Sequence, residues 1–281
     1  MIPGRVSNLF SRDVQVAVLS SGSRGNSTYI GDGRAGVLID CGLSTKQILL
    51  RMQELGLEDA PIDAVLVTHE HSDHAGACRI LSNRLAKIRG ERVPFYMTPG
   101  TAASLKPQVV PENLQTIEAG RAFRVGHMVV DPFRIPHDTL DPVAYRVGLG
   151  ERWFGVITDL GRSTTLVSQK LQSLSVAVLE FNHDVEMLLD GHYAWSVKQR
   201  IRSSHGHLSN EQAQTLLADS VGPQLEHVVL AHLSEENNAP EKALMHASMA
   251  LNQAGASKQV QIHMAQQDRP LKPISMGVHD W

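Results

Sequence analysis

The feature that most constrains how this chain can fold is a dense group of three histidines and two carboxylates at six consecutive positions. The group reads HEHSDH, from His69 to His74, and directly follows the apolar run 64–67 and Thr68. Imidazole and carboxylate are good ligands for borderline divalent ions such as Zn²⁺, and they also suit Mn²⁺ or Fe²⁺. A buried strand that ends in a loop gives ligands a rigid base and a backbone that is free to turn. The segment therefore predicts a metal site at a strand end, with His69, His71, Asp73 and His74 as ligands.

One loop cannot saturate two ions, so further ligands are expected elsewhere in the chain. His137, Asp159 and His232 each stand at the exit of an apolar, β-branched run. Strand exits are where layered α/β proteins commonly place their ligands. One such residue at a strand exit would be weak evidence for a ligand, but the pattern occurs three times. We therefore predict that these three residues bind metal together with the ligands of the HEHSDH segment.

The order of apolar patterns predicts an α/β protein. In each half, short β-branched runs come first and stretches with helical spacing follow. Two sheets packed face to face with helices on their outer faces satisfy this order. We expect a helix from about 74 to 89, and a last strand near 259–264 that precedes an irregular tail. No linker divides the chain, so residues 1–281 are expected to form a single domain.

Composition limits the possible partners. A net charge of −3 argues against a protein that coats nucleic acid through bulk charge, but a local basic patch would still suit a nuclease. Residues 1–13 lack the apolar run of a secretory signal, and no stretch approaches the roughly 18–20 apolar residues of a spanning helix. Cys41 and Cys78 suggest neither a metal pair nor a disulfide framework, only half-buried thiols. A cytoplasmic protein without membrane contact is expected.

These motifs resemble those of the metallo-β-lactamase superfamily. Asp40 is similar to the strand-end Asp of its first motif, which supports the metal loop, and the HEHSDH segment is similar to the second motif. His137, Asp159 and His232 resemble the third, fourth and fifth motifs. Within the superfamily, the YycJ (WalJ) branch is the most similar, on the segments SGSRGN (21–26), EFNHD (180–184), GHLSN (206–210) and LAHLS (230–234).

The resemblance spans about residues 14–265 and implies a four-layer αββα sandwich with two divalent ions. It implies a 5′-to-3′ exonuclease connected with DNA repair, and a further similarity to ribonuclease Z suggests phosphodiester chemistry. By the same resemblance, Asp159 would bridge the two ions. The remaining ligands would be His69, His71 and His137 for one ion, and Asp73, His74 and His232 for the other.

Hydrolysis through a metal-bound hydroxide follows from such a site. Two ions roughly 3.5–4 Å apart lower the pKa of a shared water and neutralise charge on a phosphoryl oxygen. Asp73 could orient the hydroxide, and His207 is the candidate proton donor to the leaving oxygen, because it follows a glycine and immediately precedes a helix. Ser209 and Gln212 form a capping box at that helix. Glu180, at a strand end, could hold the imidazole in its charged form. His207 could instead contact substrate or be merely exposed.

Substrate contacts are less constrained by the sequence. Arg84 and Lys87, in the basic stretch 79–92, could lead a phosphate backbone toward the ions, although a charge run is usually a solvated face. Lys198, Arg200 and Arg202 form a smaller second basic group. Two further candidates are Asn26, in a glycine-rich turn, and His183, at the rim of the site.

Two alternatives to a DNA exonuclease stay open. A hydrolase of small esters, lactones or thioesters could use the same metal pair, but it would need neither His207 nor a basic approach. A non-catalytic regulatory protein could keep the fold without turnover, although no expected ligand is missing. Which of the three ions is bound, DNA or RNA preference and the oligomeric state do not follow from the sequence.

Overall fold

The computed structural model describes residues 11–279 as two seven-stranded sheets with helices on both outer sides. The first sheet, in spatial order, consists of β14 (Ile274–His279), β1 (Ser11–Ser20), β2 (Ser27–Gly31), β3 (Gly36–Ile39), β4 (Ala64–Leu66), β5 (Phe95–Met97) and β6 (Leu114–Thr116). The second consists of β13 (Gln261–Met264), β12 (His227–Ala231), β11 (Val176–Glu180), β10 (Arg152–Ile157), β9 (Val143–Leu149), β8 (Met128–Arg134) and β7 (Phe123–Val125).

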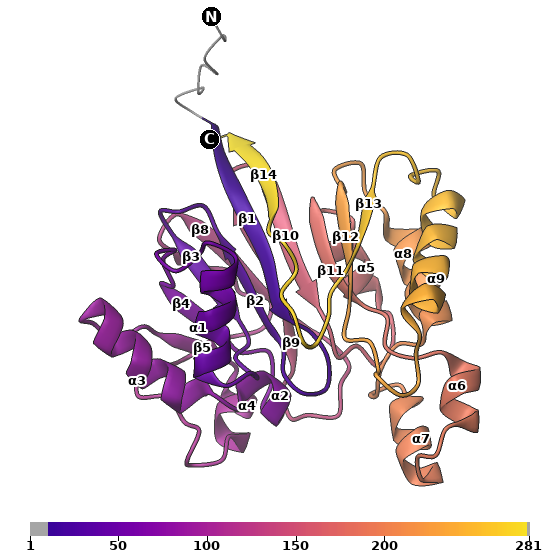
Figure 1. Cartoon of the computed structure of the whole chain (residues 1–281), viewed down its shortest axis with the longest axis horizontal. Coiled ribbons are helices and arrows are strands. Elements are labelled where there is room, and N and C mark those ends of the chain that lie inside the picture. Colours follow the sequence, from indigo (N-terminus) through magenta and orange to yellow (C-terminus); the bar gives the residue numbers. More distant parts are fainter. Residues whose placement is uncertain (1–10, 280–281) are drawn as a thin grey trace, which may run out of the picture.

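Helices cover the outer face of each sheet, and shorter ones gather at one end (Figure 1). The helices are α1 (Thr45–Glu54), α2 (Ser72–Ala75), α3 (Cys78–Arg89), α4 (Pro99–Ser104), α5 (Thr165–Leu171), α6 (Val185–Asp190), α7 (Trp195–Ile201), α8 (Asn210–Ser220) and α9 (Pro240–Gln253). In Figure 1, α1 and α3 lie on one side of the sandwich and α8 and α9 on the other. The expected αββα order is therefore confirmed.

Three apolar clusters correspond to the three interfaces between these layers. In β1, Val16 and Val18 belong to the cluster between the sheets, whereas Ala17 and Leu19 belong to the cluster under α1 and α3. This alternation follows from the period-two geometry of a strand that is buried on both faces. A third cluster packs the second sheet against α5, α8 and α9.

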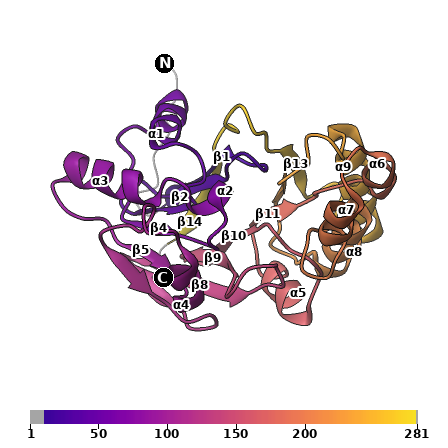
Figure 2. The same cartoon turned by 90° about the horizontal axis from the view of Figure 1, so that it is seen from below.

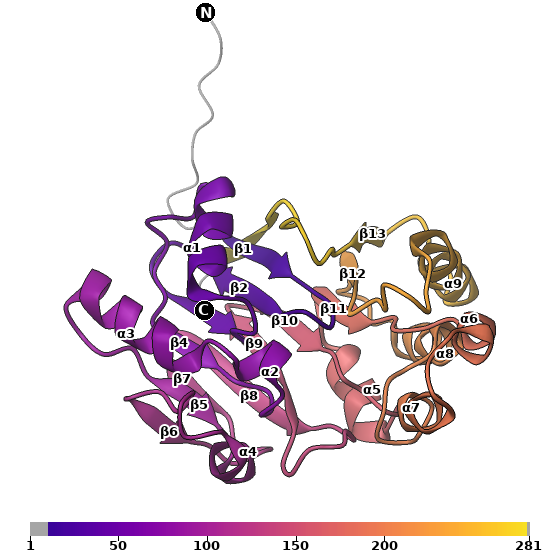
Figure 3. The same cartoon turned by 60° about the horizontal axis from the view of Figure 1, so that its bottom comes forward.

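Parallel pairing puts the exits of the site-bearing strands at one end of the sandwich. Strands β3 to β6 run parallel to one another, and so do β10 to β13. Figure 2 shows this end from below, and Figure 3 shows it turned toward the viewer, with α2, α4 and α7 around it. Residues that directly follow β3, β4, β10, β11 and β12 therefore meet there.

The helix predicted for 74–89 is in fact two helices. Continuing α2 into α3 would require the Ala77 amide to bond the Asp73 carbonyl. Instead, the Ala77 amide donates to the Cys41 carbonyl (3.0 Å), and the Asp73 carbonyl accepts from the Asn26 amide (2.7 Å). Tertiary partners thus break the helix behind the metal loop.

The predicted irregular tail contains a strand instead. β14 pairs antiparallel with β1, and Ile274, Met276 and Val278 alternate into the cluster between the sheets. Residues 1–10, most of the segment 1–13 that was expected to carry no secretory signal, lie outside the described residues. No helix within 11–279 is long and apolar enough to cross a membrane.

Candidate metal centre

Three of the predicted site residues share an unusual backbone conformation. Asp40, Asp159 and His232 have φ values of 61°, 57° and 55°, and no other non-glycine residue within 11–279 has a positive φ. Left-handed backbone is uncommon outside glycine, although Asp, Asn and His adopt it more readily than most residues. It is also concentrated at functional sites, where the surrounding structure holds it in place. At each strand exit the chain therefore turns at once, and the side chain stays at the end of the sheet.

His69, His71 and His137 form one group of converging ring nitrogens. His69 Nε2 lies 3.1 Å from His71 Nδ1, and His137 Nε2 lies 3.3 Å from the same atom. His69 and His137 are buried, and His71 is partly buried. Three imidazole nitrogens at this separation in a buried space could hold one cation among them.

Asp73, His74 and His232 form a second group, with Asp159 next to both groups. His74 Nε2 lies 3.5 Å from Asp73 Oδ2, and His232 Nε2 lies 3.8 Å from that oxygen. Asp159 Oδ1 is 3.6 Å from His232 Nε2 and 3.8 Å from His137 Nε2, which belongs to the first group. The structure thus brings all seven predicted ligands together and puts Asp159 between the two groups.

Protein acceptors fix the orientation of four of these imidazoles. The Nδ1–H of each can donate to an oxygen, which leaves Nε2 facing the cluster, an arrangement typical of histidines that ligate metals. The acceptors are Thr68 Oγ1 for His69 (3.0 Å), Asp40 Oδ2 for His74 (2.8 Å), the Gly206 carbonyl for His137 (3.1 Å) and Glu180 Oε1 for His232 (3.1 Å). Asp40, predicted as a supporting residue, contacts His74 and also accepts from the Thr68 amide.

Glu180 joins His207 to this cluster. The Nδ1–H of His207 donates to Glu180 Oε1 (2.8 Å), the oxygen that also accepts from His232. Glu180 Oε2 accepts from the amides of Leu160 (2.9 Å) and Leu208 (3.1 Å), so this buried carboxylate has four donors. Burial would raise the pKa of Glu180, but the charge and hydrogen bonds of His207 and His232 lower it to about 2. The residue is therefore ionised at neutral pH.

Charges within the cluster are strongly interdependent. Burial raises the pKa of Asp159, but the charges of His232 and His74 outweigh it and hold that pKa well below its usual value. For His232, burial lowers the pKa, yet the neighbouring carboxylates, Asp159 first, raise it to about 10. The pKa of His69 is well below its ordinary value because the ring is buried beside other imidazoles. Positive charge is thus stabilised beside Asp159, where a divalent cation could replace protons.

The donor set fits divalent ions. The Nε2 atom of His232 is buried and has no hydrogen-bond partner among residues 11–279. Asp159 Oδ2 also lacks an aligned hydrogen bond, although His74 Nε2 lies 2.9 Å away. Buried polar atoms are rarely left unsatisfied, and cations held by imidazoles and carboxylates would satisfy both. These buried His and Asp groups are typical of a dinuclear metal site.

Adding Zn²⁺ or Mn²⁺ to metal-free protein should raise its melting temperature. An ion at 100 times its Kd stabilises the folded state by about 2.7 kcal/mol, which is a rise of about 5–10 °C for a chain of this size. Differential scanning fluorimetry of EDTA-treated, dialysed protein would measure it. Asp159→Asn should lose most of the rise, whereas Asp219→Asn, the same change on an exposed helical residue, should retain it. An equal rise in all three proteins would mean that the ions bind elsewhere.

Several supporting residues were missed by sequence reasoning. Thr68 connects Asp40 to His69, Asn182 donates to the His232 carbonyl (2.9 Å), and Asp138 Oδ1 lies 3.3 Å from His137 Nε2. The Ser21 hydroxyl accepts from the His232 amide (2.8 Å). Only proximity to a ligand in the sequence could have suggested Thr68 and Asp138.

Asn26 lies under the metal loop, whereas the sequence suggested a contact with substrate. Asn26 is only 5% exposed, and its side-chain amide donates to the Gly22 carbonyl (3.0 Å). The same Nδ2 lies 3.0 Å from His74 Nε2. Cys41 and Cys78 also lie behind this loop. They are fully buried, not half-buried as expected, and their Sγ atoms are 3.3 Å apart.

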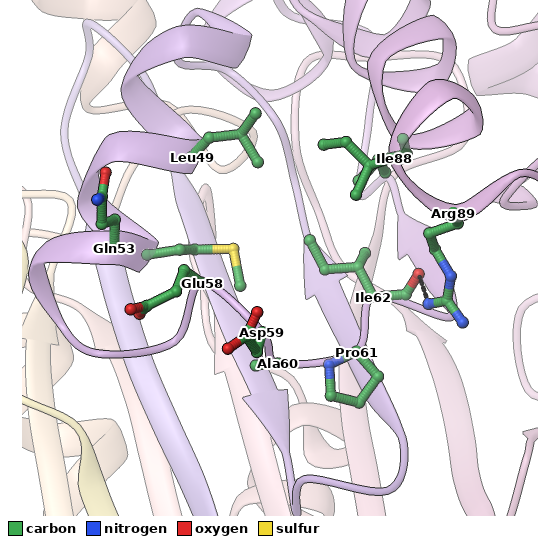
Figure 4. Close-up of a pocket in the computed structure, with 11 residues that line it drawn as sticks. Leu49, Gln53, Glu58, Asp59, Ala60, Pro61, Ile62, Ile88 and Arg89 are labelled. Atoms are coloured by element: carbon green, nitrogen blue, oxygen red, sulfur yellow. Dashed lines mark hydrogen bonds between the residues drawn. The ribbon is translucent and has the colours of Figure 1, made fainter.

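The basic stretch 79–92 runs away from the metal centre. α3 begins next to the metal loop, and near its other end Arg89 donates to the Ile62 carbonyl (2.7 Å), before the start of β4. Figure 4 shows this bond at a groove of about 590 Å³ between α1 and α3. Arg84 and Lys87 are exposed in the second half of α3. The structure therefore does not bring them to the cluster.

The smaller basic group lies nearer to the metal centre, but its members differ. Lys198 is buried, and its ammonium donates to the carbonyls of Leu189 and Gly191 between α6 and α7. Arg200 binds the carboxylate of Asp138, next to His137. Lys198 is therefore a structural contact, whereas Arg200 lies at the edge of the cluster.

Comparison with known proteins identifies the class. Residues 36–233 match the family described as "Beta-lactamase superfamily domain". The metallo-β-lactamase fold protein YhfI from Bacillus subtilis superposes with a TM-score of 0.65 at 14% identity, over 94% of this chain and 99% of YhfI. The chain belongs to the metallo-β-lactamase superfamily, as its motifs predicted, and it is a metal-dependent hydrolase of that fold.

Two relatives match nearly the whole chain. "Exodeoxyribonuclease YycJ" of Bacillus anthracis is 34% identical over 263 residues, covering 91% of this chain and 97% of the relative. "Exodeoxyribonuclease WalJ" of Streptococcus pneumoniae serotype 2 is 32% identical over 243 residues, covering 85% and 88%. The predicted similarity to the YycJ (WalJ) branch is thus confirmed.

Proposed function

We propose that this chain is a DNA exonuclease that hydrolyses phosphodiester bonds and proceeds from the 5′ end of a strand. The observation that carries the proposal is the His207–Glu180 pair beside the metal cluster, with His207 Nδ1 also 3.6 Å from Asp159 Oδ1. A fixed imidazole at this place is suited to donate a proton to a poor leaving group, such as the sugar alkoxide of DNA. Small activated esters and lactones do not need that donor.

The proposed ion sites follow the two groups of ligands. His69, His71 and His137 would hold one ion, Asp73, His74 and His232 the other, and Asp159 would contact both. Bound ions would supply an activated water and neutralise charge on the phosphate. The chain's own contribution is to fix ring orientations through Thr68, Asp40, Gly206 and Glu180, as described above.

Two side chains would move or orient protons. Glu180 accepts from Nδ1 of His207, so Nε2 is the atom that would hold and release the proton. The side chain of Asp73 is 22% exposed, against 3% for Asp159, so Asp73 is the more accessible carboxylate. It is therefore placed to orient the attacking water.

The substrate is inferred from the relatives. Both YycJ and WalJ carry the name exodeoxyribonuclease, which supports DNA as the substrate. The 5′-to-3′ polarity and a role in DNA repair rest on the resemblance of the sequence motifs to that branch.

Digestion of end-labelled oligonucleotides would test the proposal. With Mn²⁺ or Zn²⁺ present, a 5′-labelled DNA strand should release its label as the shortest product from the first time point. The same strand labelled at its 3′ end should shorten gradually. EDTA should stop both reactions, and an RNA strand of the same sequence is the comparison. Early internal cuts, or hydrolysis of aryl esters and lactones without any of DNA, would contradict an exonuclease.

A further inference from the structure

A small polar pocket lies at the start of α8, two residues along the chain from His207. Its volume is about 280 Å³, and its lining consists of His183, Val185, Arg202, Ser209, Glu211 and Gln212. His183 and Ser209 pair in a parallel bridge, and Ser209 follows His207 by two residues. Because even an extended chain rises only about 3.3 Å per residue, the Cα atoms of His207 and Ser209 are at most about 7 Å apart. The charges of Glu180 and His207 both act on His183, so the pocket lies close to the proposed proton donor.

His183 differs from the other buried histidines near the site. It is only 1% exposed, yet its Nδ1 has no hydrogen-bond partner among the described residues. His69, His74, His137 and His232 each have an acceptor at Nδ1, as shown above. Burial lowers the pKa of His183 to about 4, so its ring is neutral at pH 7 and can either accept or donate a hydrogen bond. An unsatisfied buried polar atom calls for a partner that the chain itself does not provide.

Arg202 supplies the cation of the pocket. It is exposed, and within 11–279 its guanidinium makes no hydrogen bond or ion pair, unlike the side chains of Lys198 and Arg200. Glu211 adds a carboxylate to the lining, and the side chain of Glu211 has only a 4.0 Å contact with His246. The pocket therefore offers an unpartnered imidazole nitrogen, a planar guanidinium, a carboxylate and an amide within a small volume.

These groups do not suit a phosphate. Glu211 would repel an anion, and the start of α8 is already satisfied by the reciprocal bonds between Ser209 and Gln212. The amide of Asn210 also donates, to the His183 carbonyl (2.8 Å). Little of the helix terminus is left to bind an anion.

An unpaired nucleobase matches the same groups well. Bases of single strands stack on guanidinium planes, and their edges form hydrogen bonds with ring nitrogens, carboxylates and amides. The volume is below the usual range of about 300–1,000 Å³ for pockets that enclose a whole ligand, which suits one ring system. We propose that this pocket holds an unpaired base of the substrate strand, close to the bond that is cleaved. This inference rests on the proposed function.

Abasic substitution along a single strand would test the pocket. A fluorescent DNA oligonucleotide is prepared in versions with one tetrahydrofuran residue at successive positions from the 5′ end. Binding is read by anisotropy in EDTA, where no turnover occurs, and KM and kcat are measured with ions present. At one position the abasic residue should weaken binding by about 5- to 150-fold, with a matching rise in KM and little change in kcat.

Variants of the pocket should remove this sensitivity. His183→Ala and Arg202→Ala should bind the intact strand less tightly and no longer distinguish it from the abasic one. His183→Phe, which keeps a buried ring but has no ring nitrogen, should lose the discrimination as His183→Ala does. Arg202 is exposed, so its variant is expected to fold even if His183→Ala does not. Lys258→Ala removes an exposed cation outside the pocket and should behave like wild type.

The outcomes separate this pocket from the proposed activity. The proposed base pocket would be wrong if the abasic residue weakened binding equally at every position. It would also be wrong if both pocket variants still distinguished the intact strand from the abasic one. A loss of affinity on methylphosphonate substitution, with none on abasic substitution, would also contradict the proposal, because the pocket would then bind phosphate. If neither DNA nor an aryl phosphodiester is hydrolysed, the proposed function fails, while the anisotropy data still decide the pocket.

Discussion

Asp73→Asn is expected to lower kcat by about 1,000-fold, to a similar extent on DNA and on an activated aryl phosphodiester. The change removes a negative charge that lies 3.5 Å from His74 Nε2 and 3.8 Å from His232 Nε2. Charge stabilisation by a metal site contributes several kcal/mol to the transition state, and about 1.4 kcal/mol corresponds to a factor of ten. Steady-state assays on both substrates would measure the loss.

A matched control lies in the same loop. Glu70→Gln makes the same chemical change three residues away, but Glu70 Oε1 accepts from the Leu140 amide (3.2 Å) and lies outside the ligand groups. Its kcat should stay within a few-fold of wild type. Circular dichroism would confirm that both variants fold. Full activity in folded Asp73→Asn protein would exclude Asp73 from the chemistry.

His207→Ala is expected to affect the two substrates differently. Loss of a general acid typically costs 100- to 10,000-fold, so kcat on DNA should fall by about 1,000-fold. An aryl leaving group scarcely needs a proton, so kcat on the aryl phosphodiester should fall by less than about tenfold. The ratio of the two losses is the measurement, because any general disturbance of the metal site would affect both substrates equally.

Imidazole rescue gives this variant its own control. Added imidazole can occupy the space of the missing ring next to Glu180, whose Oε1 it can reach as His207 Nδ1 does at 2.8 Å. Partial recovery of DNA hydrolysis, with no change for the aryl substrate, is expected. His205→Ala, at an exposed neighbouring histidine, should keep wild-type rates. Equal losses on both substrates in His207→Ala would argue against a proton donor.

Much of the fold and of the ligand set could be predicted from local sequence. HEHSDH is informative because its ligands lie within one loop, and Asp159 and His232 because each follows an apolar strand. Residues that directly follow parallel strands lie at the same end of a sheet. The grouping of these ligands therefore follows from the sequence pattern and the topology. The strand β14 was also visible in principle, because Ile274, Met276 and Val278 alternate.

What the sequence could not show depends on tertiary partners. The break between α2 and α3 arises because Cys41 and Asn26, far earlier in the chain, take the hydrogen bonds that would continue the helix. The basic stretch predicted a path to the ions, but a charge pattern does not reveal in which direction its helix runs. The contact between Cys41 and Cys78 likewise depends on how α3 is placed against β3.

The ligands come from both halves of the sandwich. His69, His71, Asp73 and His74 follow a strand of one sheet, and His137, Asp159 and His232 follow strands of the other. Bound cations would therefore link the two halves of the sandwich. Losing them should loosen the chain first at this rim, so amide hydrogen exchange there would respond to metal more than exchange deep in the apolar interior. The concentration of available metal would then determine both the turnover of the enzyme and the local stability of this rim.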